Sequence, residues 1–206
     1  VKFYEARSYA VVPQNLKGTR KREFNYAMSP AAYPSSCSYF LATKSYKKSP
    51  DRQFEIRHNV RLQSAHDPEV FVSPDYAVIE KDSVIEVLPP HAYGGGGTSF
   101  YYVKAKDLRT FGECKHYTPS GEMILNFVGL VNELMPPLLM NGAPTSPPVH
   151  FGPSLFISGV GSQHAGRIKA SLETRYGINV FLCVFQRPNQ LYSVRNYPNI
   201  MKIGSV

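Results

Sequence analysis

The C-terminal quarter of the chain alternates apolar runs with a helical pattern that has clear start and stop signals. This order constrains the fold more than any other stretch of the sequence. Ser154–Ser158 and Ile178–Phe185 are short apolar runs of the kind that form buried strands. Between them, Gly159–Gly161 predicts a tight turn, and Ser162–Tyr176 predicts a helix because its apolar residues recur on one stripe. Gly177 ends that helix. The order predicts an α/β module built on a strand–helix–strand unit.

The residues before this module predict a small antiparallel sheet and one more helix. Phe54–Gln63 alternates apolar and polar residues, as a half-buried strand does. Ala77–Val87 predicts a hairpin with a polar turn, and Ser99–Leu108 predicts a further strand. Ser120 is a suitable N-cap for a helix from about residue 121 to residue 135, which a proline pair then stops. We therefore expect an α+β chain in four parts: an extended basic arm (1–53), an antiparallel β-region with one helix (54–135), a proline-rich linker (136–153) and a ferredoxin-like α/β module (154–206), which ends in an edge strand over 199–206.

Positive charge is concentrated at the two ends of the chain. The net charge is +8, and the balance is +7 for residues 1–50, −4 for residues 51–150 and +5 for residues 151–206. Such segregation is typical of surfaces that contact nucleic acid. Tyrosines lie among the cations of the arm, a mixture that suits RNA because cations neutralise phosphates while rings stack on unpaired bases. A solvated basic surface, or an arm whose tyrosines contact protein neighbours, is the alternative interpretation.

The cysteines, the first residues and the apolar stretches of the sequence indicate in which cellular compartment we expect the protein. Cys37, Cys114 and Cys183 form no closely spaced pair, which favours a reducing compartment. We expect Cys183 to be a buried thiol because it lies in an apolar run. The sequence begins with Val and shows no apolar secretory signal, so we expect a mitochondrial protein whose presequence has been removed, with a cytoplasmic location as the alternative. Polar residues and prolines interrupt the longest apolar stretch, Met123–Met140, so we expect no membrane span.

The glycines and histidines do not form a catalytic motif. Gly159, Gly161 and Gly166 lack the spacing of a dinucleotide-binding fingerprint. The histidines and cysteines lack the spacing of zinc ligands. We therefore expect no enzyme, no cofactor, no metal and no small-molecule substrate. A small enzyme centred on His58 or His91 is the alternative.

The last helix and strand also carry a resemblance to a known family. The relevant residues are Ile168-Lys169, Leu172, Tyr176-Gly177 and Ile178-Asn179-Val180. In this order they resemble the twenty-third protein of the large ribosomal subunit, over about the last quarter of the chain. The resemblance implies a protein that packs on large-subunit RNA beside the peptide exit tunnel, next to other ribosomal proteins, without a catalytic role. The same region also resembles a K-homology RNA-binding module, although its glycines do not have the Gly-x-x-Gly spacing of that module.

We therefore predict a structural, ribosomal-RNA-binding constituent of an organellar (mitochondrial) large ribosomal subunit. A free-standing RNA-binding factor with a K-homology-like module is the alternative. The predicted RNA contacts are the basic residues of the arm and of the module: Lys17, Arg20, Lys21, Arg22, Lys47, Lys48, Arg167, Lys169, Arg175, Arg187, Arg195 and Lys202.

Overall fold

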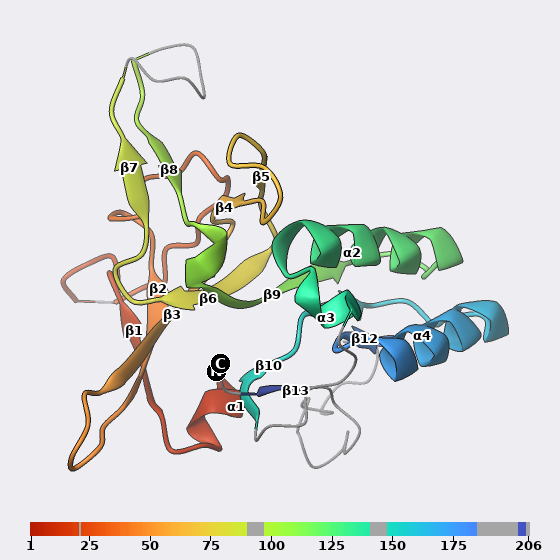
Figure 1. Cartoon of the computed structure of the whole chain (residues 1–206). Coiled ribbons are helices and arrows are strands. Elements are labelled where there is room, and N and C mark those ends of the chain that lie inside the picture. The colour runs from red at the N-terminus through yellow and green to blue at the C-terminus, as the bar shows by residue number, and fades with distance from the viewer. Residues whose placement is uncertain (21, 90–96, 141–147, 185–201, 205–206) are drawn as a thin grey trace. The chain divides into compact units, whose positions relative to one another are not determined.

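The chain folds into two compact units with both helices and strands, so the α+β class expected from the sequence is confirmed. The computed structural model describes residues 1–20, 22–89, 97–140, 148–184 and 202–204 (Figure 1). The two units are Val1–Arg109 and Thr110–Val206.

The first unit is built on an antiparallel sheet with the strand order β1-β2-β3-β6. A short helix, α1 (Lys2–Glu5), precedes it. Phe54 and Ile56 of β3 are buried, and Phe54 joins the rings of Tyr4 and Tyr9 in the core. The strands are β1 (Ala10–Gln14), β2 (Tyr39–Lys44), β3 (Arg52–His58) and β6 (Tyr76–Glu80).

Two small two-stranded sheets complete the first unit. One pairs β4 (Leu62–Gln63) with β5 (Phe71–Val72). The other pairs β7 (Ile85–Val87) with β8 (Phe100–Tyr102) and extends away from the main sheet (Figure 1). A 3₁₀ turn, Ala105–Asp107, follows β8.

Residues 1–53 are not an extended arm. They contribute α1, β1 and β2, and β2 pairs with β3 over five residue pairs, from Phe40 opposite Ile56 to Lys44 opposite Arg52. These strands were not predicted from the sequence because their apolar residues do not alternate regularly with polar ones. Phe40, Leu41 and Ala42 follow one another directly.

Two other expectations for the first unit are also wrong. The strand expected over Phe54–Gln63 is interrupted, because Asn59 has a left-handed φ of 47° and donates its side-chain amide to the carbonyl of Ala27 (2.6 Å). The hairpin expected over Ala77–Val87 does not form, since β6 pairs with β3 while β7 pairs with β8. Asp82, with φ 58°, turns the chain out of the main sheet between them.

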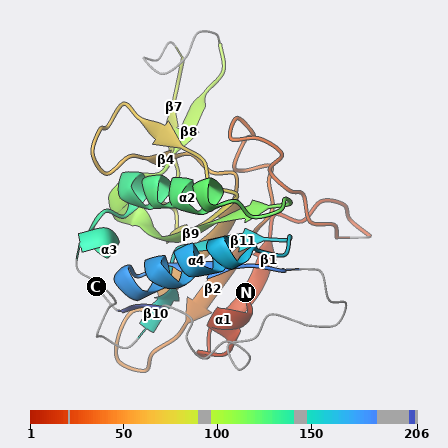
Figure 2. The same ribbon diagram turned by 90° about the vertical axis from the view of Figure 1, so that its right-hand side faces the viewer.

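The second unit contains three parallel strands in the order β9-β11-β12. They are β9 (Leu108–Lys115, in this unit from Thr110), β11 (Ser154–Ile157) and β12 (Asn179–Phe181). The helices α2 (Gly121–Leu134) and α4 (Gln163–Arg175) each connect one strand to its parallel neighbour. Because the strand order advances in one direction, right-handed connections place both helices on the same face, and Figure 2 shows them side by side.

Local signals explain the helices of this unit, and the predicted strand–helix–strand order is confirmed. The Ser120 and Ser162 side chains cap α2 and α4 by accepting from the backbone N–H groups of Met123 (3.1 Å) and Ala165 (3.2 Å). Gly159 lies in the turn before α4. A Cβ there would be 2.3 Å from the carbonyl oxygen of Tyr117, so the turn requires glycine.

Other details of the module differ from the expectation. A ferredoxin-like module splits its β-α-β unit around another strand, whereas β11 and β12 pair directly. The expected linker 136–153 contains α3 (Pro137–Met140) and β10 (Pro148–Phe151), and β10 pairs with β13 (Lys202–Gly204). Cys183 is exposed, with φ 60°, because β12 ends two residues before it.

Helices of the described ranges are too short or too polar to cross a membrane.

Candidate nucleic-acid interface

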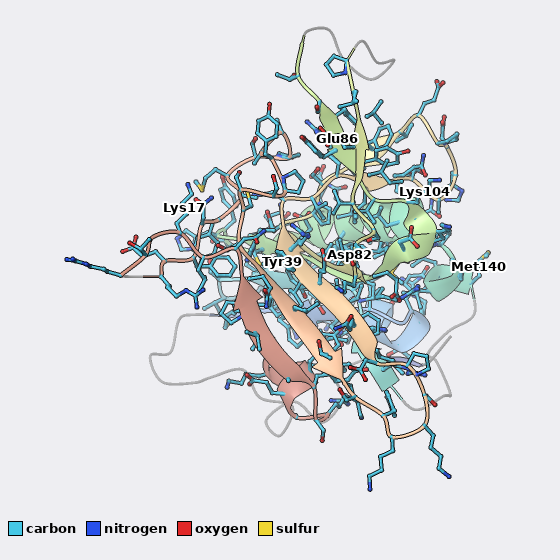
Figure 3. All side chains as sticks on the ribbon, turned by 90° about the vertical axis from the view of Figure 1, so that its left-hand side faces the viewer. Lys17, Tyr39, Asp82, Glu86, Lys104 and Met140 are labelled. Carbon is cyan, nitrogen blue, oxygen red and sulfur yellow. The ribbon has the colours of Figure 1, made fainter. Side chains whose placement is uncertain are left out.

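The first unit presents a short basic loop, residues 17–23, which begins three residues after the end of β1. Two backbone hydrogen bonds close it: Lys17 N–H donates to the carbonyl of Glu23, and Glu23 N–H donates to that of Lys17, both at 2.9 Å. Gly18 has a φ of 86°, which permits the turn. The side chains of Lys17, Arg20 and Arg22 are exposed, and none of them forms an ion pair with a described residue. Figure 3 shows Lys17 at the edge of the unit.

An aromatic cluster follows the basic loop immediately. It consists of Phe24, Tyr26, Phe40 and His58. The Phe24 ring stacks on the ring of Phe40, with centroids 4.9 Å apart, and lies 4.7 Å from that of Tyr26. Tyr26 in turn lies 5.2 Å from the imidazole of His58. Phe40 is opposite Ile56 in the β2–β3 register, and His58 is two residues further along β3, so both side chains lie on one face of the sheet. Tyr26 is 57% exposed and offers a ring face to a ligand.

Burial within this cluster favours the neutral form of His58. Desolvation lowers the pKa of the imidazole below its ordinary value, although a hydrogen bond to the backbone of Asp75 opposes the shift. A neutral ring favours aromatic contact over phosphate binding. Its role in the cluster is therefore packing.

A second basic element lies at the β2–β3 hairpin. Lys47 and Lys48 are exposed at its tip. Below the tip, Lys44 Nζ and the Arg52 guanidinium each lie 5.9 Å from the ring centroid of Tyr46. Lys44 also donates to the carbonyl of Arg7 (2.9 Å), which fixes its position. The hairpin thus presents cations around an aromatic ring.

A buried ion pair lies on the opposite face of the sheet from the aromatic cluster, because Glu55 and Arg57 alternate with Ile56 and His58 along β3. Glu55 is 1% exposed and accepts from Arg57 Nε at 2.5 Å, while the backbone N–H of Asp82 donates to its other oxygen (3.1 Å). The Arg57 guanidinium lies 3.9 Å from the ring centroid of Tyr39 and donates to the carbonyl of Pro34 (3.3 Å). Burial, and then the charge of Glu55, raises the pKa of Tyr39. Figure 3 shows Tyr39 and Asp82 on this face. Arg57 therefore connects the loop between β1 and β2, at Pro34, to strand β3.

The predicted contacts of the second unit have varied environments. Arg167 is exposed on α4. Lys169 forms an ion pair with Glu173, and the other carboxylate oxygen of Glu173 accepts from the backbone N–H of Val180 (2.8 Å). The charge of Lys169 is therefore balanced by a carboxylate of the same helix. Arg175 donates to the carbonyl of Ser171 (3.2 Å) and lies over the ring of Tyr176.

Lys21, Arg187 and Arg195 lie outside the described residues. Lys202 is described only in the backbone of β13.

The structure brings together Lys17, Arg20 and Arg22, and separately Lys47 and Lys48. Sequence reasoning missed Phe24, Phe40, Lys44 and Arg52. The pairs Arg22–Phe24 and Lys44–Tyr46, each a cation two residues from a ring, are the signal that could have found Phe24 and Lys44.

Three comparisons of the chain, with protein-family models, with curated proteins and with solved structures, find no match. Within the described ranges, no three His, Cys, Asp or Glu side chains gather as metal ligands would. His91, one of the two histidines considered for catalysis, lies outside those ranges.

Proposed function

We propose that this chain binds RNA through its first unit, as a structural constituent of an organellar large ribosomal subunit. One observation carries the RNA-binding part: an exposed basic loop leads directly into an aromatic cluster. Lys17, Arg20 and Arg22 supply charge for phosphates. Tyr26, more than half exposed, supplies a ring on which an unpaired base stacks.

The basic hairpin extends this proposed surface. Lys47 and Lys48 are free to contact phosphates because they project from a turn, while Lys44 and Arg52 flank Tyr46. In the second unit, Arg167 is the exposed cation of α4 and supports a smaller contact. Lys169 is left out of the proposed surface because its charge is neutralised by Glu173.

Binding of a labelled single-stranded RNA to the purified full chain, followed by fluorescence anisotropy, tests the RNA-binding part. Tyr26→Ala is expected to weaken binding by about tenfold, the effect of losing one stacked base. Tyr117→Ala removes a tyrosine of the second unit that is 70% exposed and is expected to leave the affinity unchanged. Equal losses in the two variants would contradict a stacking role for Tyr26.

The ribosomal part rests on the charge segregation and on the resemblance of residues 155–180 to the large-subunit protein. It includes a mitochondrial location, with neighbouring ribosomal proteins as partners. Tagged full-length chain from fractionated mitochondria is expected to sediment with large subunits through a sucrose gradient, and to shift to the top after ribonuclease treatment. A chain that binds RNA but sediments alone would be a free-standing RNA-binding factor.

A further inference from the structure

A second region of the first unit holds a cation beside an open cavity. Arg61 lies between β3 and β4, where its carbonyl accepts from the backbone N–H of Val103 (2.9 Å). Its guanidinium carbon lies 4.5 Å from the ring centroid of Phe100 in β8. No ion pair or side-chain hydrogen bond connects Arg61 to another described residue. Partial burial lowers its pKa from the ordinary value, although the group stays charged at neutral pH.

The cavity has the composition of a ligand site. Its volume is about 700 Å³, and its walls include Arg61, Glu69, Phe71, Phe100, Ser29 and Ser73. The rings of Phe71 and Phe100 meet edge to face, with centroids 5.1 Å apart. Glu69 is exposed and forms no ion pair within the described ranges, so the cavity offers one cation, one carboxylate and two aromatic walls.

This cavity continues toward the aromatic cluster. A narrow second cavity shares Ser29, Pro30 and Arg61 with it and reaches His58. His58 is a member of the aromatic cluster, where it contacts Tyr26. The second cavity has a volume of only about 20 Å³, so it holds no nucleotide itself, although Arg61 and His58 both line it.

We propose that the cavity receives one unpaired RNA base that carries an exocyclic amino group, stacked on Arg61 and recognised by Glu69. The inference rests on the proposed RNA-binding function and adds base selectivity to it. Phe100 covers one face of the guanidinium, and the other face is a plane on which a base stacks. The Glu69 carboxylate accepts a hydrogen bond from an amino group, such as N4 of cytosine. Uracil presents an oxygen at the same position and is repelled by the carboxylate.

Equal lengths of oligocytidylate and oligouridylate test the inference, because the two bases have nearly the same shape and differ in their hydrogen-bonding groups only at positions 3 and 4. The full chain is expected to bind oligocytidylate several-fold more tightly in fluorescence anisotropy. Glu69→Ala is expected to abolish this preference while preserving binding. Arg61→Lys keeps the charge but removes the planar guanidinium on which the base stacks, so it is expected to weaken the binding of both RNAs by about tenfold. Arg109→Lys, the same exchange at an arginine of the first unit that pairs with Glu80 outside the proposed surface, is expected to change neither affinity.

The outcomes separate this inference from the proposed function. Equal affinity for the two RNAs, a preference that survives Glu69→Ala, or an unaffected Arg61→Lys variant would overturn the base site while RNA binding stands. Absence of any RNA binding would overturn both. Titration of the wild-type chain with cytidine monophosphate adds a readout independent of the variants' folding. The Arg61 side-chain N–H and the Phe71 and Phe100 ring resonances are expected to shift, and a saturating titration without shifts would overturn the site.

Discussion

Replacement of Arg57 by methionine is expected to destabilise the first unit strongly. Methionine keeps most of the aliphatic length but leaves Glu55, which is 1% exposed, without its cation. An uncompensated buried charge of this kind costs about 3–5 kcal/mol of unfolding free energy. The variant also loses the contact with the Tyr39 ring and the hydrogen bond to the carbonyl of Pro34. The expected loss lies at the upper end of that range.

Arg109→Met is the matched control. Arg109 Nε lies 2.5 Å from Glu80 Oε1, the same separation as in the Arg57–Glu55 pair. The side chains of Arg109 and Glu80 are 30% and 36% exposed, however, so water screens the pair. A surface ion pair contributes about 0–1 kcal/mol, and the control is expected to lose no more than that.

Urea unfolding followed by circular dichroism measures both variants, with the free energies obtained by linear extrapolation. The double variant Glu55→Leu, Arg57→Met replaces the charges with apolar groups and is expected to recover part of the loss. A loss below about 1 kcal/mol for Arg57→Met, or equal losses for the two single variants, would refute the reasoning from burial.

Three further predictions concern local features. Gly159→Ala places a Cβ 2.3 Å from a backbone oxygen and should destabilise the second unit by about 1–3 kcal/mol in thermal unfolding. Gly166→Ala, whose Cβ would have no atom within 4 Å, should stabilise the same unit by about 1 kcal/mol. The lowered pKa of His58 means that the unfolded chain binds more protons, so its contribution is complete above about pH 6.5 and is lost as the pH falls below it. His58→Phe should flatten this part of the stability profile, and an unchanged profile would contradict the shift. Ser120→Ala should cost about 1 kcal/mol through the lost N-cap of α2, while Asn126→Ala on the same helix should not.

The helices of the second unit could be predicted because their signals are local. Serine caps, a glycine stop and one apolar stripe lie within a few residues of each other, and they place the start of α4 correctly. The strand pairing was not predictable in the same way. β6 and β7 are neighbours in sequence but do not share a partner. β6 pairs with β3, which precedes it in the chain, and β7 pairs with β8, which follows it. Periodicity does not encode such partners.

The candidate interface was predicted only in its charges. The exposed Lys17, Arg20 and Arg22 were named from composition, but the stacking of Phe24 on Phe40 depends on a sheet that brings distant residues together. Lys169 illustrates what the sequence does not show about the environment of a predicted contact. The sequence shows that Lys169 and Glu173 are four residues apart on one helix, a spacing that allows an ion pair. It does not show that Glu173 also accepts a hydrogen bond from the backbone of Val180 in β12.

The salt dependence of RNA affinity tests the central claim most directly. The logarithm of the binding constant should fall linearly with the logarithm of salt concentration, with a slope of about −0.7 for each phosphate contacted on a single strand. Combined replacement of Lys17, Arg20 and Arg22 by alanine should make the slope shallower by about 2, since three contacts are lost. Replacement of Lys81, Lys104 and Lys106, which removes the same charge elsewhere on the first unit, should leave it almost unchanged. Identical slopes for the wild-type chain and the basic-loop variant would contradict the proposed interface.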